Sequence, residues 1–389
     1  MLSGIAVGAV CGILWPSVAR VAGPVGDAFL NLIFVLVVPL VFFSVSLSLC
    51  RLRSGGKLGT VVGRMVVVFV LMWLLYCLIT YPSTLIFSLT GDGPTLLPSA
   101  SGEAGEAVRL GGNFAAAVSV DDFPNLFSKY NLLPLIIFSA LLGLGVSMAG
   151  EKGASFRAFL ESGEEVISQT LNLVMYAAPV GLGCYMADTL AGEGLGMAGG
   201  YMRVLLLYCA LTLFFFCIVN PLLVRVTHGR AALKAFWQNI LPPSLTAVAT
   251  ASSAAAMPGN IEAARRMGVD RDVADTVVPL ATNLLKAGSV CGGVLKAVFA
   301  MMLGGMDYAG LGPGLTCIGI AILAGAVTGA VVNGGVTGGV LVCSMLGLAD
   351  PAIVGAVTIV GTLFDIPATL LNSQANVVAA VLVDRRRAD

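Results

Sequence analysis

The sequence predicts an all-α polytopic membrane protein, because its charge content is low and its apolar runs are long. The chain has 389 residues, of which 58% are hydrophobic and 11% are charged. Soluble domains carry about 25% charged residues, so 21 basic and 21 acidic side chains are too few to cover a soluble protein of this length. The apolar runs reach the length of about 20 residues that a helix needs to cross a bilayer.

Eight stretches are predicted to be transmembrane helices from their length and apolar composition. In chain order they are residues 2–19, 28–49, 62–90, 132–149, 168–191, 201–224, 273–302 and 355–383. The first lacks the basic segment of a signal peptide, so we expect a first span there and not a cleaved leader. Two further stretches, 235–258 and 311–347, are apolar but contain glycine, proline and small polar residues.

The basic residues predict the orientation, because lysine and arginine are enriched in cytoplasmic loops. They form five clusters, which are Arg51, Arg53, Lys57 and Arg64; Lys152 and Arg157; Arg225, Arg230 and Lys234; Arg265, Arg266 and Arg271; and Arg385, Arg386 and Arg387. The loop at 91–125 is mainly acidic and polar, which fits the outer side. With all five clusters inside, both termini are expected in the cytoplasm.

The same placement of charge predicts two re-entrant helical hairpins. Segment 235–258 has cytoplasmic clusters on both sides, so it must enter and return at the inner face, with its tip at Thr250–Ala254. Segment 311–347 must start and finish outside, and its middle, Asn333–Gly339, holds too many glycines for a continuous helix. Hairpins that enter from opposite faces indicate an inverted repeat around a central binding site. The alternative is two ordinary helix pairs with small-residue packing.

The composition also argues against several other functions. The net charge is zero, so no nucleic-acid partner is expected. His228 is the only histidine and the nine cysteines are scattered singly, which disfavours a metal site. The chain has no HExxH or GxSxG context and no paired aspartates on neighbouring spans, so we expect no catalytic residues and no enzyme activity.

Several motifs are similar to those of a known family in their order and spacing. They are Val38-Pro39-Leu40-Val41-Phe42 in the second span, Leu133 to Phe138 in the fourth, Tyr176 to Gly181 in the fifth, the serine-containing stretch Thr250 to Gly268, and Thr369-Leu370-Leu371-Asn372 in the last span. Through these motifs, nearly the whole chain resembles the dicarboxylate/amino acid:cation symporter family, the glutamate transporter homologues.

The resemblance implies a homotrimer in the lipid bilayer of a plasma membrane of the bacterial inner-membrane type. Each subunit would have a fixed scaffold, residues 1–57 and 113–196, and a transport domain, residues 58–112 and 197–389. The transport domain would carry a small-molecule substrate across the membrane by an elevator motion.

The resemblance also implies which residues bind substrate. At the two hairpin tips these are Ser252, Ser253, Gly335 and Thr337, whose hydroxyl and backbone groups would hold a carboxylate, aided by helix N-termini. In the last span they are Asp365, Ala368, Thr369 and Asn372. Asp365 matches an aspartate that holds the substrate's amino group. Ala368 stands where members with acidic substrates have an arginine, which favours a smaller or neutral substrate such as serine, threonine or alanine.

The family's sodium sites are largely missing. Leu285-Lys286-Ala287-Gly288-Ser289 stands where the family has Asn-Met-Asp-Gly-Thr, so Gly288 and a hydroxyl at Ser289 are kept while an asparagine and an aspartate are lost. Asn372 matches a sodium-binding asparagine, but Asn376 replaces an aspartate. Phe69, Met72 and Trp73 replace polar side chains in the third span. Hard cations need several oxygen ligands, so sodium remains a candidate ion whose usual ligands are absent.

Lys286 is the most informative residue, because a lysine inside an apolar span is costly unless it is paired. It is interpreted as a built-in cation at a former ion site, or as a proton carrier. The alternative is a structural pair with Asp365 or with nearby carbonyls. We expect Lys296, nearer the outer end, to extend toward the membrane interface.

The sequence therefore favours a secondary active transporter, a symporter of this family, for a small neutral amino acid or carboxylate, with sodium coupling in doubt. The alternatives are an uncoupled or proton-coupled carrier, or a non-transporting substrate sensor, on the same fold.

Overall fold

The computed structural model describes residues 2–50, 57–87, 89, 120–128, 131–193, 195–327, 334–348 and 350–384. Within these ranges every regular element is a helix, which confirms the predicted all-helical class. Most of the predicted outer loop, up to residue 119, lies outside the described residues, as do Arg51, Arg53, Asn333 and the basic residues at 385–387.

The helices follow one another in this order. The first half contains α1 (Leu2–Leu14), α2 (Pro16–Cys50), α3 (Lys57–Ile86), α5 (Phe123–Leu126), α6 (Leu132–Met148), the 3-10 helix η1 (Gly150–Gly153), α7 (Ala154–Tyr176) and α8 (Ala178–Glu193). The second half contains α9 (Leu195–Phe214), the π-helix η2 (Phe215–Val219), α10 (Asn220–Thr250), α11 (Ser253–Arg266), α12 (Arg271–Leu284), α13 (Ala287–Leu303), α14 (Leu311–Val327), α15 (Gly334–Met345) and α16 (Pro351–Val383).

Five described helical segments are long and apolar enough to cross a membrane. They are Pro16–Cys50, Gly63–Ile86, Gly199–Thr250, Arg271–Leu303 and Pro351–Val383. A sixth is obtained if Gly150–Tyr176 and Ala178–Gly192, which meet at a bend of 58°, form one span. At 2–19 and 132–149 the structure has the shorter apolar helices α1 and α6, and α1 stops just before Pro16, a residue that favours a new helix start. The total of eight spans stays a prediction.

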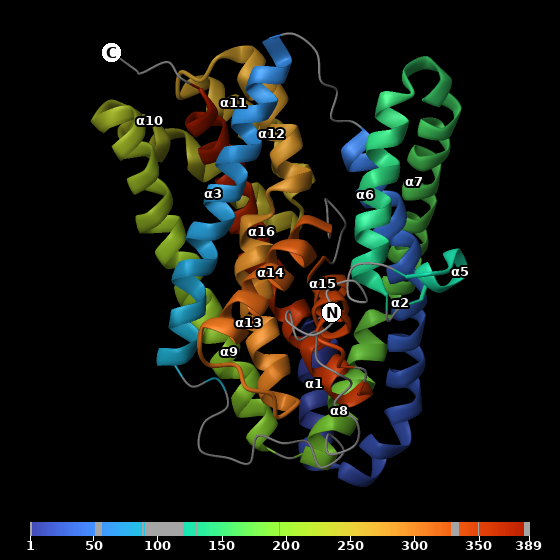
Figure 1. The fold of residues 1–389 in the computed structure, drawn as a ribbon. Helices are drawn as coiled ribbons and strands as arrows, with labels where there is room; N and C mark the ends of the chain where they lie inside the picture. The colour runs from blue at the N-terminus through green and yellow to red at the C-terminus, as the bar shows by residue number, and fades with distance from the viewer. Residues whose placement is uncertain are drawn as a thin grey trace.

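The helices gather into two groups (Figure 1). One group consists of α1, α2, α6, α7 and α8, and the other of α3 with α9 to α16. The groups meet where α15 contacts α2 and α6 and where α16 contacts α8. At the second contact the Tyr185 hydroxyl of α8 lies 3.0 Å from the Pro351 carbonyl oxygen, to which it donates a hydrogen bond.

Glycines allow the backbones of α1 and α8 to touch. A Cβ atom on Gly4, Gly8 or Gly12 would overlap the carbonyl oxygen of a residue on α8. The spacing of four residues places these glycines on one face of α1, the pattern of small residues that lets membrane helices approach closely. This packing fixes α1 against α8, although α1 is too short to span the membrane by itself.

Three predicted cytoplasmic segments lie at one end of the molecule. His228 Nε2 is hydrogen-bonded to the Asp384 carbonyl oxygen at 3.2 Å, and the Asp270 backbone N–H donates to the Asp384 carboxylate at 2.7 Å. These contacts bring together the segments at 225–234 and 265–271 and the end of α16. The charge pattern predicts that these segments share one side, and the cytoplasmic orientation of that side stays a prediction.

The first hairpin is present as a helix–turn–helix. The chain changes direction inside α10 at Gly229, where φ is 84° and ψ is −172°. From there the second part of α10 runs to Thr250, Ala251 adopts a left-handed conformation with φ 47°, and α11 returns alongside α10. The predicted tip at Thr250–Ala254 is therefore correct, while the returning limb continues to Arg266, past the predicted end at 258.

The second hairpin differs from the prediction at its middle. The glycine-rich stretch was expected to be non-helical, but residues 334–339 form the first part of α15. Their glycines serve close packing instead, because a Cβ on Gly335 would overlap the Gly361 carbonyl oxygen of α16 and one on Gly361 would overlap the carbonyl oxygen of Gly335. The connection between α14 and α15 falls at residues 328–333, outside the described residues.

The predicted span at 273–302 is two helices and not one. α12 ends at Leu284 and α13 begins at Ala287, and the Lys286 backbone between them is left-handed, with φ 38° and ψ 42°. All residues of α13 except Ser289 are buried, so this break lies deep in the second group of helices.

Candidate functional site

Four chain segments meet around the break between α12 and α13. They are the tip of the first hairpin at Ser252–Ser253, the break itself, the N-terminus of α15 and the middle of α16. Their contacts with one another, described below, bring together most of the side chains that the sequence analysis selected. Three of these segments present helix N-termini, those of α11, α13 and α15, which carry partial positive charge.

Lys286 connects the break to the first hairpin. Its side chain is 5% exposed, and its ammonium donates a hydrogen bond to the Ser253 hydroxyl oxygen at 3.0 Å. Ser252, the neighbouring residue, caps α11, because its hydroxyl oxygen accepts the Ala255 backbone N–H at 3.3 Å. The lysine thus reaches the hairpin tip that was predicted to hold a substrate carboxylate.

Side chains donate hydrogen bonds to backbone carbonyls on both sides of the break. The Trp73 indole N–H of α3 donates to the Leu285 carbonyl oxygen. The Tyr208 hydroxyl of α9 donates to the Gly288 carbonyl oxygen at 2.8 Å. Both carbonyls therefore accept a hydrogen bond from the protein itself.

Asn372 of α16 fixes the start of α13. Its Oδ1 accepts the backbone N–H groups of Gly288 and Ser289 at 2.8 and 3.2 Å, and its Nδ2 donates to the Ser289 hydroxyl at 3.1 Å. Gly288 also packs directly on α16, because a Cβ there would overlap the Ala368 carbonyl oxygen. The amide of Asn372 thus uses both its acceptor and its donor on the protein.

Asn376, one turn further along α16, belongs to a different contact. Its Nδ2 donates to the Thr282 hydroxyl of α12 at 3.0 Å, while its Oδ1 is buried without a hydrogen-bond partner among the described residues. Asn372 and Asn376, both predicted to belong to the cation site, lie one turn apart on α16 but contact different helices, α13 and α12.

Asp365 holds the N-terminus of α15. Its carboxylate accepts the Gly335 backbone N–H at 2.9 Å, and the ammonium of Lys296 donates to the carbonyl oxygen of the same glycine at 3.3 Å. Gly335 therefore lies between a buried cation and a carboxylate. The hydroxyls of Thr337 and Thr369 donate to backbone carbonyls of their own helices, at 3.3 and 2.7 Å.

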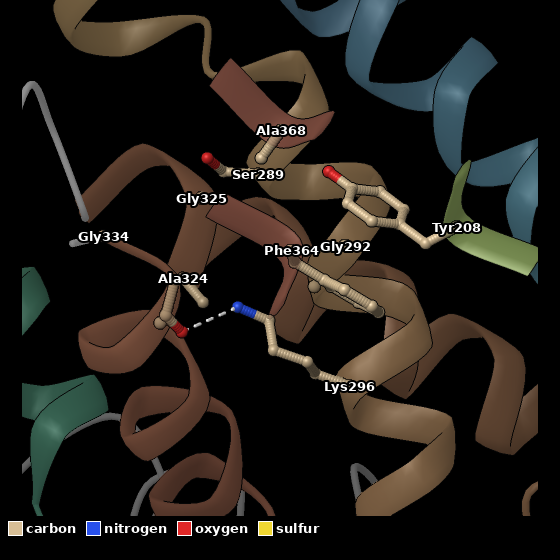
Figure 2. A pocket seen from close by; sticks show the side chains of 12 residues that line it. Tyr208, Ser289, Gly292, Lys296, Ala324, Gly325, Gly334, Phe364 and Ala368 are labelled. Carbon is tan, nitrogen blue, oxygen red and sulfur yellow. Dashed lines mark hydrogen bonds between the residues drawn. The ribbon is translucent and has the colours of Figure 1, made fainter. Parts of the chain in front are cut away.

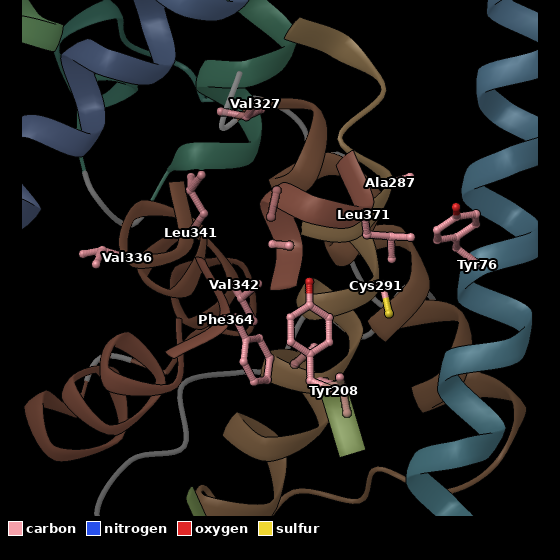
Figure 3. Close-up of a cluster of buried hydrophobic side chains, with 14 of the residues drawn as sticks. Tyr76, Tyr208, Ala287, Cys291, Val327, Val336, Leu341, Val342, Phe364 and Leu371 are labelled. Carbon is pink, nitrogen blue, oxygen red and sulfur yellow. The ribbon is translucent and has the colours of Figure 1, made fainter. Parts of the chain in front are cut away.

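A small cavity of about 20 Å³ lies beside these groups (Figure 2). Its lining comes from α9, α13, α14, α15 and α16 and includes Tyr208, Ser289, Lys296, Phe364 and Ala368. On one side it is closed by the rings of Tyr208 and Phe364, whose centroids are 4.1 Å apart, and apolar side chains surround this pair (Figure 3). The cavity thus combines an apolar wall with a lysine and a hydroxyl.

The structure corrects the prediction for Lys296 and argues against one alternative interpretation of Lys286. Lys296 does not extend to the membrane interface: it is 4% exposed and its ammonium lies in the cavity wall. Among the described residues Lys286 and Asp365 form no salt bridge, because the Lys286 ammonium donates to the Ser253 hydroxyl and the Asp365 carboxylate accepts the Gly335 backbone N–H. Asp365 is nevertheless close enough to both lysines to interact with them electrostatically.

Three functional side chains were missed by sequence reasoning. Tyr208 gave no signal, because a tyrosine in an apolar span is common. Trp73 was noted only as the loss of a polar residue, whereas its indole N–H acts as a hydrogen-bond donor to the break. Lys296 carried the same signal as Lys286, a charge inside an apolar span, but its position near the end of the predicted span pointed to the interface.

Comparison with known proteins identifies the family. The profile of the sodium:dicarboxylate symporter family matches residues 1–386. The chain is 24% identical to a C4-dicarboxylate transport protein of Bacillus subtilis, over 83% of this chain and 77% of that protein. It is also 24% identical to the proton/sodium-glutamate symport protein of Bacillus subtilis, over 98% of this chain and 90% of the relative.

A third relative is the serine/threonine transporter SstT of Streptococcus agalactiae, which is 24% identical over 98% of this chain and 94% of its own length. The family and these relatives are transporters and not enzymes, which confirms the expectation from the sequence. A match over nearly the whole chain, together with several helices long and apolar enough to cross a bilayer, establishes a multi-pass membrane protein. The chain belongs to the sodium:dicarboxylate symporter family.

Proposed function

We propose that this protein is a secondary transporter for a small amino acid or carboxylate, in which the ammonium of Lys286 replaces the coupling cation. The observation that carries the proposal is the position of that ammonium. It emerges from a broken span and donates to Ser253 at the hairpin tip, where helix N-termini converge. A carboxylate transporter needs a positive electrostatic potential at its substrate site. Here the potential comes from a side chain of the protein, the Lys286 ammonium, and not from a bound ion.

The chemistry of the break supports the loss of sodium coupling. Sodium is held by oxygen atoms, but the carbonyl oxygens of Leu285 and Gly288 accept hydrogen bonds from Trp73 and Tyr208. The Oδ1 of Asn372 accepts two backbone N–H groups. A lysine ammonium also repels a second cation in a site of low dielectric constant. The residues present do not fit a sodium ion, so no transport step is assigned to one.

The substrate site of the proposal is formed by Ser252, Ser253, Gly335, Thr337, Asp365, Ala368, Thr369 and Asn372. Around it, Lys286, Gly288, Ser289 and Asn376 occupy the positions of the former cation sites. Ala368 provides no positive charge for a second carboxylate, and the cavity is small. These features favour a substrate with a short carbon chain.

The two groups of helices suggest how the site would move. In the proposal, α1, α2, α6, α7 and α8 form the scaffold within residues 1–57 and 113–196. The transport domain comprises residues 58–112 and 197–389 and moves as an elevator past the scaffold. A homotrimer in a bacterial plasma membrane, with both termini in the cytoplasm, completes the proposal. Contacts between the groups through α15 and α16 are the interface along which such a motion would occur.

Uptake into proteoliposomes tests the proposal. Purified protein is reconstituted, and uptake of radiolabelled alanine, serine and lactate is measured with an inward sodium gradient, an inward proton gradient or no ion gradient. We expect uptake of at least one of these solutes that does not require sodium. Uptake that occurs only with sodium would contradict the replacement of the cation. Uptake that occurs only with a proton gradient would indicate proton coupling. Substrate binding without uptake would indicate a substrate sensor.

A further inference from the structure

The candidate site carries an unbalanced charge. Lys286 and Lys296 are buried, Asp365 is partly buried, and Asp365 lies close enough to each lysine to interact with it electrostatically. With the lysines protonated and the aspartate ionised, two positive charges face one negative charge. Residues 328–333, which lie outside the described part of the chain, contain no ionisable side chain. The site therefore has one net positive charge before a substrate binds.

Lys296 has unused hydrogen-bonding capacity toward the cavity. Its ammonium has three donors, and its hydrogen bond within the described residues uses one of them, on the Gly335 carbonyl oxygen at 3.3 Å. The ion pairs of the described residues involve Arg265, Arg266 and Arg271, far along the chain from this lysine. A 4% exposed lysine at a cavity wall, whose ammonium uses one of its three donors on the described part of the chain, is a site for an anion (Figure 2).

Three classes of substrate leave different charges in the site. An α-amino acid has no net charge at neutral pH, so it would leave the extra positive charge buried and uncompensated. A dicarboxylate would leave one uncompensated negative charge. A monocarboxylate without an amino group neutralises the site. Because an unpaired buried charge is costly at membrane depth, the electrostatics favour the monocarboxylate.

We propose that Lys296 is a specificity-determining residue that selects a short monocarboxylate lacking an α-amino group, such as a 2-hydroxy acid, over the corresponding amino acid. The inference rests on the proposed transport function and names the substrate class of the same site. The carboxylate of the substrate would bind between the lysine ammonium groups and the helix N-termini.

The inference predicts a reversal of preference when Lys296 is replaced. In Lys296→Met, the positive charge of Lys286 and the negative charge of Asp365 cancel. The site then has no net charge, which suits a zwitterionic amino acid. Lys234→Met is the matched control, because Lys234 is exposed and lies outside the site. Methionine has a similar length to lysine and keeps the apolar contacts of its stem.

The experiment measures binding to purified full-length protein in nanodiscs by isothermal titration calorimetry. The ligands are the pairs lactate and alanine, and glycerate and serine, in which a hydroxyl at C2 replaces the ammonium. We expect the unsubstituted protein and Lys234→Met to bind each hydroxy acid at least about tenfold more tightly than its amino acid, the effect of one charge-assisted hydrogen bond. Lys296→Met should bind the amino acid more tightly.

Two results would overturn the inference: amino acids binding to the unsubstituted protein as tightly as the hydroxy acids, or an unchanged preference in Lys296→Met. The first comparison needs no variant, so it decides the question even if Lys296→Met fails to fold. Failure of the proposed function is distinguishable, because then neither member of either pair is bound or taken up by proteoliposomes. Amino-acid uptake without hydroxy-acid binding would contradict only the inference.

Discussion

The ammonium of Lys286 donates a hydrogen bond to the hydroxyl oxygen of Ser253 at 3.0 Å, joining a break in a buried helix pair to the tip of a helical hairpin. The two residues are 33 positions apart in the chain. In the proposed function, this contact places a covalently attached cation at the position of the coupling ion. The arrangement of the site around this contact leads to the predictions that follow.

Replacing Lys286 with methionine is expected to lower uptake. Lys286→Met removes the ammonium and its hydrogen bond to Ser253, an interaction of a charged group worth about 1.5–3 kcal/mol. We therefore expect the initial rate of uptake by proteoliposomes to fall at least about tenfold. Lys234→Met, on an exposed part of α10, should transport at the normal rate. Equal rates for the two variants would remove Lys286 from the mechanism.

Replacing Trp73 with phenylalanine is expected to destabilise the protein. Trp73→Phe deletes the donor to the Leu285 carbonyl oxygen, and a buried carbonyl without a partner costs about 1–3 kcal/mol. The measurement is thermal unfolding in nanodiscs. Trp237→Phe is the control, because the Trp237 ring contacts Phe216 and Phe236 and lies away from the break. If Trp73→Phe unfolds no earlier than this control, the indole is not needed to satisfy the break.

Replacing Gly335 with alanine is expected to separate α15 from α16. The added Cβ would overlap the Gly361 carbonyl oxygen and approach the Asp365 carboxylate, and overpacking typically costs about 1–3 kcal/mol. We expect lower thermal stability and weaker substrate binding in Gly335→Ala. Gly319→Ala is the control, because a Cβ on this glycine of α14 meets no atom within 4 Å. Normal binding and stability in Gly335→Ala would show that the close approach is dispensable.

Charge and apolar length predicted much of the fold. The basic clusters on both sides of 235–258 required the chain to return to the same face, and the structure has a turn at Ala251. The charge of Lys286 in an apolar stretch marked the centre of the site, where the structure places a left-handed backbone. The turn at Ala251 and the unusual position of Lys286 leave a signal in the sequence because burying a charge or an unpaired backbone group is costly.

Other features depend on contacts between distant segments. The glycines at 334–339 would weaken an isolated helix, yet α15 forms because they allow it to pack on the backbone of α16. Lys296 was assigned to the interface from its place along a predicted span. Its burial follows from the N-terminus of α15 lying on α13, which no local pattern reveals. The role of Trp73 likewise requires knowing that α3 passes beside the break.

The central claim is that a lysine ammonium has replaced the coupling cation, and simultaneous measurement of sodium and substrate fluxes tests it most directly. Proteoliposomes are loaded with unlabelled substrate, and entry of radioactive sodium is followed together with entry of the labelled substrate that is bound most tightly. We predict substrate entry with no sodium entry above that of protein-free vesicles. Sodium entry in a fixed ratio to substrate would contradict the claim.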